Sequence, residues 1–161
     1  MKTSRLVDPL VSVIIPNFNG EPYIEEAITS VFMQKAPFLI ELIIVDDGST
    51  DGSLEIIKRL QNTYVDIKLI ELKENTGKGF AVGAGYDIAL GKYVQILDAD
   101  DYLLCEEKFQ IQVDFMESNP SFCASAHNTL VFGNNQQNIL LPDIHEDTDF
   151  SYMSILKFEF Y

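Results

Sequence analysis

Short apolar runs alternate with amphipathic segments along the first 120 residues of the chain. Runs rich in β-branched or alternating apolar residues are typical of strands, and they fall at residues 11–15, 40–45, 66–72 and 92–97. Segments with apolar residues at helical spacing follow each of them, at residues 20–34, 54–61, 80–90 and 106–119. This order predicts an α/β domain with a mostly parallel sheet and helices on both faces.

The alternation weakens after the dipeptide Asn119-Pro120. Residues 121–133 are compatible with a pair of strands, and the polar residues 134–138 with a turn after them. An apolar, aromatic run without a helix cap ends the chain. We find no internal repeat and no linker, so we predict a single domain over residues 1–161.

The composition is that of a globular protein, since 47% of the residues are hydrophobic and 22% are charged. No segment is long and apolar enough to cross a bilayer, and Asp8-Pro9 interrupts the apolar part of the N-terminus. We therefore predict neither a membrane span nor a signal peptide. Cys105 and Cys123 have neither metal-binding nor redox spacing. Free thiols in a reducing cytoplasm are the simplest interpretation, and association with the inner face of the membrane is left open.

Acidic residues outnumber basic residues by 25 to 11, which gives a formal net charge of −14. This excess argues against nucleic acid as a partner, because binding to a phosphate backbone needs a basic surface. A small anionic ligand would also be repelled unless a metal ion or backbone amides offset the charge.

Polar residues follow each predicted strand. The four clusters are PNFNG at 16–20, DDGSTDGS at 46–53, ENTGKG at 74–79 and DADD at 98–101. The carboxyl ends of parallel strands meet at one edge of a sheet, and ligands of such sheets bind at that edge. The four clusters together therefore predict a binding site there.

The carboxylates of Asp98, Asp100 and Asp101 lie within four positions, where like charges repel one another. A hard cation such as Mg²⁺ or Mn²⁺ would bind carboxylate oxygens and leave coordination positions open for phosphate and water. Alternatively, Asp100 or Asp101 caps the helix that follows, although a cap uses only one acid. A second Asp-x-Asp pair, Asp147 and Asp149, lies in a polar stretch that is more typical of a helix start.

The other residues at the strand ends each have two interpretations. Asp46 and Asp47 could accept hydrogen bonds from a nucleobase or a ribose, or Asp47 could form an Asx-turn with the two residues after it. Lys78 could reach a phosphate at a helix N-terminus, or lie exposed on a flexible loop. Phe18 could stack on a base, or pack in the core. The two histidines are isolated in sequence and suggest no nucleophile-base arrangement.

Four segments, VSVIIPNFNGEPYIEEAITSVFMQ, ELIIVDDGSTDGS, ENTGKG and GKYVQILDADD, closely resemble the family 2 glycosyltransferases of GT-A fold. The resemblance runs from about residue 11 to residue 120, with four motifs in the family's order and spacing. It implies a Rossmann-like nucleotide-diphospho-sugar transferase fold in which residues 11–120 form the donor-binding half. Residues 121–161 would then begin an incomplete acceptor-side region.

The resemblance implies that the sugar of a nucleotide diphosphate, commonly UDP, is transferred with inversion to a hydroxyl acceptor. The acceptor would be a saccharide or a lipid-linked saccharide, and polysaccharide biosynthesis is the usual context. Mn²⁺ or Mg²⁺ would be held by Asp98 and Asp100 and would offset the charge that develops on the diphosphate. The resemblance assigns nucleotide binding to Pro16, Phe18, Asn19, Asp46, Asp47, Gly77, Lys78, Asp98 and Ala99.

This chain departs from the family pattern in two ways. The third motif of the family usually continues with Arg and Asn, but this chain has Val82 and Gly83 at those positions. A basic residue near the phosphates is therefore missing, and the identity of the nucleotide sugar is left open. An inverting transfer also needs a general base, which in the family lies beyond the donor-binding half. No motif marks a base in this chain, so we expect a truncated transferase or the donor-binding half of one.

Two other classes of protein use related features. A sugar nucleotidyltransferase binds nucleotide on a similar sheet but carries an Arg and a Lys in its first loop, which PNFNG lacks. A receiver-like signalling domain binds Mg²⁺ with acids at strand ends, but it needs an Asp after the third strand, where this chain has Glu71 or Glu74.

Overall fold

The computed structural model describes residues 8–64, 66–127, 129–133 and 136–141. The chain divides into two compact units, Met1–Pro120 and Ser121–Tyr161. The first unit contains all the strands and helices that the alternating pattern predicts, and its sheet positions the candidate site.

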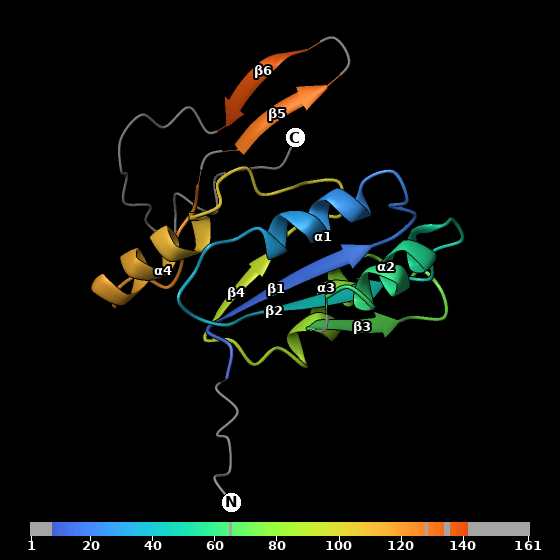
Figure 1. The fold of residues 1–161 in the computed structure, drawn as a ribbon, viewed down its shortest axis with the longest axis horizontal. Coiled ribbons are helices and arrows are strands. Elements are labelled where there is room, and N and C mark those ends of the chain that lie inside the picture. The colour runs from blue at the N-terminus through green and yellow to red at the C-terminus, as the bar shows by residue number, and fades with distance from the viewer. Residues whose placement is uncertain (1–7, 65, 128, 134–135, 142–161) are drawn as a thin grey trace, which may run out of the picture. The chain divides into compact units, whose positions relative to one another are not determined.

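Four strands form the sheet of the first unit (Figure 1). They are β1 (Val11–Asn17), β2 (Ile40–Asp46), β3 (Ile67–Glu71) and β4 (Tyr93–Ile96). Their order is β3-β2-β1-β4, and every neighbouring pair is parallel, which confirms the predicted fold class. Asn17 at the end of β1 lies beside Asp46 at the end of β2, and Asp46 lies beside Glu71 at the end of β3. The predicted polar clusters therefore do follow the same edge.

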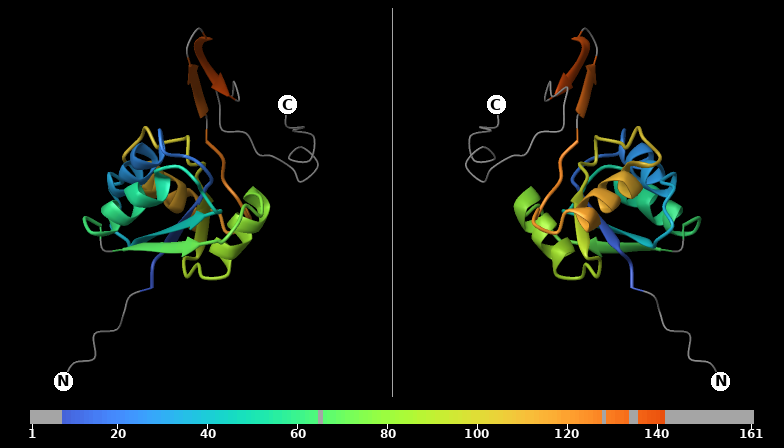
Figure 2. Two further views of the ribbon diagram at one scale, coloured as in Figure 1. Left: turned by 90° about the vertical axis from the view of Figure 1, so that its right-hand side faces the viewer. Right: turned by 90° about the vertical axis from the view of Figure 1, so that its left-hand side faces the viewer.

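Four helices cover the two faces of this sheet: α1 (Ile24–Phe32), α2 (Ser53–Gln61), α3 (Lys78–Tyr86) and α4 (Lys108–Ser118). With the sheet seen nearly edge-on, α3 lies on the opposite side from α1 and α2 (Figure 2). The predicted bounds are wrong mainly for α1, which begins at Ile24 after a turn closed on the Gly20 carbonyl, and for α3, which ends at Tyr86. No helix in the described residues is long and apolar enough to cross a membrane.

The apolar side chains of β1 and β2 alternate between two core clusters. Val13 and Ile15 pack with α1, α2 and α4 on one face of the sheet, whereas Ile14 packs with Ala81 of α3 on the other. Helix α3 approaches the sheet so closely that a Cβ atom on Gly85 would lie 2.6 Å from the Cγ2 atom of Ile14. The absence of a side chain at Gly85 is thus what lets α3 lie on the sheet and places its first residue at the candidate site.

A buried carboxylate, Glu41 of β2, ties α3's exit loop to the sheet. It accepts hydrogen bonds from Lys68 Nζ and from the Leu90 amide, both at 2.6 Å, and from the Ser12 hydroxyl. Burial alone would raise the pKa of Glu41, but the hydrogen bonds from Lys68, Ser12 and Leu90 outweigh burial and hold the pKa below its ordinary value. The predicted strand 40–45 includes Glu41, but the sequence pattern did not identify the partners of its buried carboxylate.

The second unit contains an antiparallel pair of strands, β5 (Thr129–Gly133) and β6 (Gln136–Leu141). A strand pair was expected within residues 121–133, so the pairing is confirmed but its position is wrong: only β5 lies there, and β6 begins inside the polar stretch predicted as a turn. The predicted helix start at Asp147 and the aromatic end of the chain lie outside the described residues.

Candidate functional site

The site begins where β1 and β2 end side by side. Asp46 is buried, and its Oδ1 atom accepts a hydrogen bond from Asn17 Nδ2 at 2.8 Å. Its Oδ2 atom accepts one from the Ser49 amide at 3.1 Å. Asp46, and not Asp47 as one interpretation predicted, therefore closes the turn after β2. Both oxygens of Asp46 have partners within the protein.

The loops after β1 and β2 are joined by two reciprocal pairs of hydrogen bonds. The Asn19 amide donates to Ser49 Oγ at 3.0 Å, and Asn19 Oδ1 accepts from the Thr50 amide at 2.8 Å. Asn19 adopts a left-handed backbone conformation, φ +53°, which asparagine tolerates better than most residues. In the second pair, the Glu21 amide donates to Asp51 Oδ2 at 3.0 Å, and Glu21 Oε2 accepts from the Gly52 amide at 2.9 Å. These hydrogen bonds therefore hold the two loops against each other.

Asp47 holds the loop that leads into α3. It is 3% exposed, its Oδ1 atom accepts from the amide and hydroxyl of Thr76 at 2.8 and 2.7 Å, and its Oδ2 atom accepts from the Gly77 amide at 2.8 Å. Burial acts to raise the pKa of Asp47, but these hydrogen bonds outweigh it, so the pKa lies below its ordinary value. Gly77 then begins α3 with φ +92°, a conformation that favours glycine. Asp47 is therefore a charged carboxylate at neutral pH.

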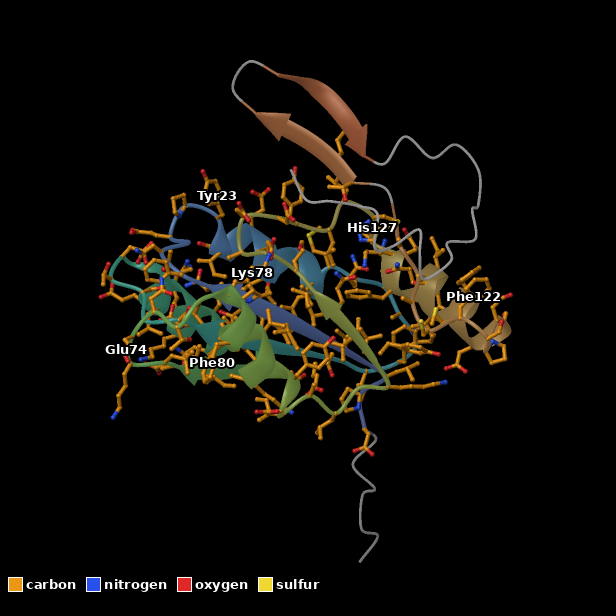
Figure 3. The ribbon with its side chains drawn as sticks, turned by 180° about the vertical axis from the view of Figure 1, so that it is seen from behind. Tyr23, Glu74, Lys78, Phe80, Phe122 and His127 are labelled. Carbon is orange, nitrogen blue, oxygen red and sulfur yellow. The ribbon has the colours of Figure 1, made fainter. Side chains whose placement is uncertain are left out.

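Lys78, the first residue of α3, connects this loop to the end of β4. Its Nζ atom lies 2.6 Å from Asp98 Oδ1 and 2.7 Å from Asp98 Oδ2. Seen from behind, α3 lies in front of the sheet, with Lys78 and Phe80 near its beginning (Figure 3). A continuous set of contacts thus runs from Asp47 through Gly77 and Lys78 to Asp98. Lys78 is therefore exposed, as the alternative interpretation predicted, but it begins a helix and pairs with Asp98, so the flexible-loop part of that interpretation is wrong.

The three acids after β4 remain close to one another. The Asp101 amide donates to the Asp98 carbonyl at 3.0 Å, which closes a turn. Burial and then the charges of Asp100 and Asp98 raise the pKa of Asp101, and Lys78 offsets this only in part. Helix α4 begins at Lys108, too far along the chain for Asp100 or Asp101 to cap it, and its N-cap residue makes no side-chain bond. The helix-cap interpretation of these acids is therefore wrong.

The acids after β4 suit a divalent cation whose coordination shell is completed by a ligand. Asp98 and Asp100 supply hard carboxylate oxygens, and the hydrogen bond from the Asp101 amide to the Asp98 carbonyl keeps the three acids together. Within the described part of the chain, no three acidic, histidine or cysteine side chains converge into a complete metal cage. Such an incomplete set matches Mg²⁺ or Mn²⁺, which protein sites often bind through one or two carboxylates together with phosphate and water.

The remaining predicted nucleotide-binding residues surround these contacts. Phe18 follows β1 and is 46% exposed, so the interpretation of its ring as a core aromatic is wrong. Pro16 and Ala99 are half-buried, and Asn19 is exposed. A Cβ atom on Gly20 would lie 3.4 Å from the Ala99 Cβ atom, so the loops after β1 and β4 are neighbours.

The sequence reasoning missed Asn17, Glu21 and Asp51 as residues that position the site. Asn17 is 1% exposed and donates to both Asp46 and Ser49, at 2.8 and 3.1 Å. Burial raises the pKa of Asp51, but hydrogen bonds from Ser53 and from the Glu21 amide lower it overall. An asparagine directly after an apolar strand was the one available signal, because a buried amide needs partners nearby.

Solved structures place this parallel sheet, with acids at the ends of β2 and β4, in the class of glycosyltransferase domains of GT-A fold. The mannosyltransferase PcManGT from Pyrobaculum calidifontis, solved with GDP-Man and Mn²⁺, matches with a TM-score of 0.64 and 32% identity, covering 69% of this chain and 33% of that chain. TarS 1-349 from S. aureus, solved with UDP, matches with a TM-score of 0.63 and 32% identity, covering 68% and 32%.

The chain belongs to glycosyl transferase family 2, whose family model matches residues 12–158. An uncharacterized glycosyltransferase of Haemophilus influenzae is 32% identical over 92% of this chain and 62% of its own length. The putative teichuronic acid biosynthesis glycosyltransferase TuaG of Bacillus subtilis is 41% identical over 67% of this chain and 42% of its own length. The chain therefore spans only part of these relatives. The predicted family is confirmed, and neither alternative class is needed.

Proposed function

We propose that this domain binds a nucleotide-diphosphate sugar, with UDP as the expected nucleotide, and transfers the sugar with inversion to a hydroxyl acceptor. The observation that carries the proposal is the continuous set of contacts Asp47–Gly77–Lys78–Asp98. These contacts bring Asp47, a helix N-terminus with a lysine, and Asp98 to one edge of the sheet, which supports base binding by Asp47 and cation binding by Asp98. The GDP-Man, UDP and UDP-GlcNAc complexes of PcManGT and TarS support the choice of ligand.

The nucleoside would lie over the loops after β1 and β2. Among the described residues, Asp47 Oδ2 accepts one hydrogen bond, from the Gly77 amide, so it retains a lone pair for a base N–H group. The exposed ring of Phe18 is available for stacking on the base, beside Pro16 and Asn19. Asp46 acts by holding the turn, because both its oxygens already accept hydrogen bonds.

The diphosphate would lie between the start of α3 and the end of β4. Backbone amides at a helix N-terminus favour an anion, and Gly77 and Lys78 begin a helix that has no side-chain cap. Asp98 and Asp100 would hold Mn²⁺ or Mg²⁺, with Ala99 between them. A bound divalent cation supplies positive charge where negative charge develops on the leaving diphosphate. That charge also lets a protein of net charge −14 bind an anion.

The acceptor side of the reaction is a second part of the proposal. Residues 11–120 would form the donor-binding half, and residues 121–161 would begin the acceptor-side region. The general base would belong to that region, and the acceptor would be a saccharide or a lipid-linked saccharide reached from the cytoplasm, at the inner face of the membrane. Polysaccharide biosynthesis is the context that the name of TuaG suggests.

Thermal unfolding tests the nucleotide and cation part of this proposal. A ligand present at 100 times its Kd stabilises the native state by about 2.7 kcal/mol, so UDP with Mn²⁺ should raise Tm by about 8 °C. Asp100→Ala should abolish the cation-dependent part of this rise. The matched control Asp114→Ala, which removes the same charge from an exposed position on α4, should keep it. If neither UDP nor GDP changes Tm with Mn²⁺ or without it, the proposal is wrong.

A further inference from the structure

Lys78 forms an ion pair with Asp98, the acid that binds a divalent cation in the proposed function. The ammonium group lies within hydrogen-bond distance of both carboxylate oxygens, at 2.6 and 2.7 Å. No oxygen of Asp98 is therefore left without a positively charged neighbour. A divalent cation that bound this carboxylate would meet the lysine at the same two atoms.

The backbone of Lys78 is anchored, whereas its side chain is free to move. The preceding residue, Gly77, donates its amide to the buried carboxylate of Asp47, and α3 begins at Lys78 itself. The side chain of Lys78 is 62% exposed and that of Asp98 is 39% exposed. An exposed ion pair is weak, and a lysine has a flexible four-carbon stem, so the ammonium group can change partners at little cost.

Three acids lie within four positions at the end of β4, where like charges repel one another. Lys78 offsets part of this repulsion by pairing with Asp98 at 2.6 and 2.7 Å. A bound Mn²⁺ or Mg²⁺ would neutralise these acids more strongly and would repel the ammonium group from Asp98. A nucleotide diphosphate bound at the start of α3 offers the displaced ammonium a new anionic partner.

We infer that Lys78 takes the place of the divalent cation on Asp98 when no cation is bound, and that it moves to the diphosphate when cation and nucleotide bind. The inference rests on the proposed function and adds an exchange of partners to it. It has two consequences of opposite sign. Loss of Lys78 removes a competitor and so strengthens binding of the cation alone, but it weakens binding of the nucleotide diphosphate.

Two titrations of Lys78→Met measure these consequences separately. Electron paramagnetic resonance of free Mn²⁺ gives the affinity for the cation without nucleotide, and we expect it to become about two- to fivefold tighter than in the wild type. Calorimetry at saturating Mn²⁺ gives the affinity for UDP, and we expect it to become about tenfold weaker. Lys92→Met is the matched control, because Lys92 is 57% exposed and pairs with Glu117 at 2.6 Å before β4. Both affinities should stay unchanged in this control.

The direction of the two changes decides the inference. If both affinities change in the same direction, or if the affinity for Mn²⁺ does not change, Lys78 is not exchanging partners and the inference is wrong although the proposed function stands. If the wild type binds neither Mn²⁺ nor UDP, the proposed function fails as well. Circular dichroism checks that the variant is folded, and Lys78→Gln, which keeps a polar side chain, provides a second uncharged variant.

Discussion

Lys108 places a positive charge in the interior of the first unit, and this charge should make stability depend on pH. The residue is 8% exposed at the start of α4. Its Nζ atom donates to the side-chain oxygens of Gln95 and Gln112, both at 2.7 Å, and lies 4.7 Å from the centroid of the Phe109 ring. These partners are neutral, so burial lowers the pKa of Lys108 from 10.5 to about 8.

The sign of the effect follows from the direction of this shift. The folded state binds the proton of Lys108 less tightly than the unfolded state, so stability rises with pH wherever only the unfolded state is still protonated. The destabilisation caused by the buried charge of Lys108 is complete below the folded-state pKa of about 8 and disappears above the ordinary value of 10.5. At about 1.4 kcal/mol for each pH unit, the cost at pH 7 is about 3 kcal/mol.

Urea unfolding of Lys108→Met, followed by circular dichroism, measures this cost. At pH 7 the variant should be more stable than the wild type by up to about 3 kcal/mol, because an apolar side chain of similar length replaces a buried charge. The advantage should shrink by about 2 kcal/mol at pH 9.5, where the folded wild type has lost the proton. Lys58→Met, at an exposed lysine, controls for the general effect of removing a charge. A difference that stays constant between these pH values, or a destabilised variant at pH 7, would refute the reasoning.

Two further predictions concern Asp47 and the helix that it positions. Asp47→Asn should lose about 2 kcal/mol of stability in urea unfolding and should weaken UDP binding. The reason is that one amide oxygen cannot accept all three hydrogen bonds from Thr76 and Gly77. A variant as stable as the wild type would contradict this. Gly85→Ala should destabilise by about 1–3 kcal/mol, since its Cβ atom would clash with Ile14. In contrast, Gly83→Ala has open space and should stabilise α3 by up to about 1 kcal/mol. Equal effects of the two alanines would contradict the close packing of α3.

The sheet was predictable because its strands carry a strong pattern. The β-branched runs of β1 and β2 are buried on both faces, so they stand out against the polar loops that follow them. Helix α3 was harder to delimit, because among its nine residues only Ala81 and Gly85 are buried and it has no capping side chain. Its packing on the sheet depends on the close approach of Gly85 to Ile14, which no local pattern encodes.

The position of the four polar clusters was predictable, but the contacts of their residues were not. Parallel strand ends must meet at one edge, so the convergence of the four clusters followed from topology alone. Which of Asp46 and Asp47 closes the turn was not predictable, because adjacent acids have the same local propensity. The partners that distinguish them, Asn17 and Gly77, lie 29 to 30 residues away in sequence from the acid that each contacts.

The contacts also explain how an acid-rich edge can serve an anionic ligand. Asp46 and Asp47 direct their oxygens at side-chain and backbone N–H groups, and Asp98 is neutralised by a lysine. Partners inside the protein therefore offset most of these negative charges, and each acid fixes the position of a loop at the site. Asp100 and Asp101 are exposed, and their negative charge favours a cation at this end of β4. Under the proposed exchange of partners, the cation, or a nucleotide that carries it, displaces Lys78 from Asp98.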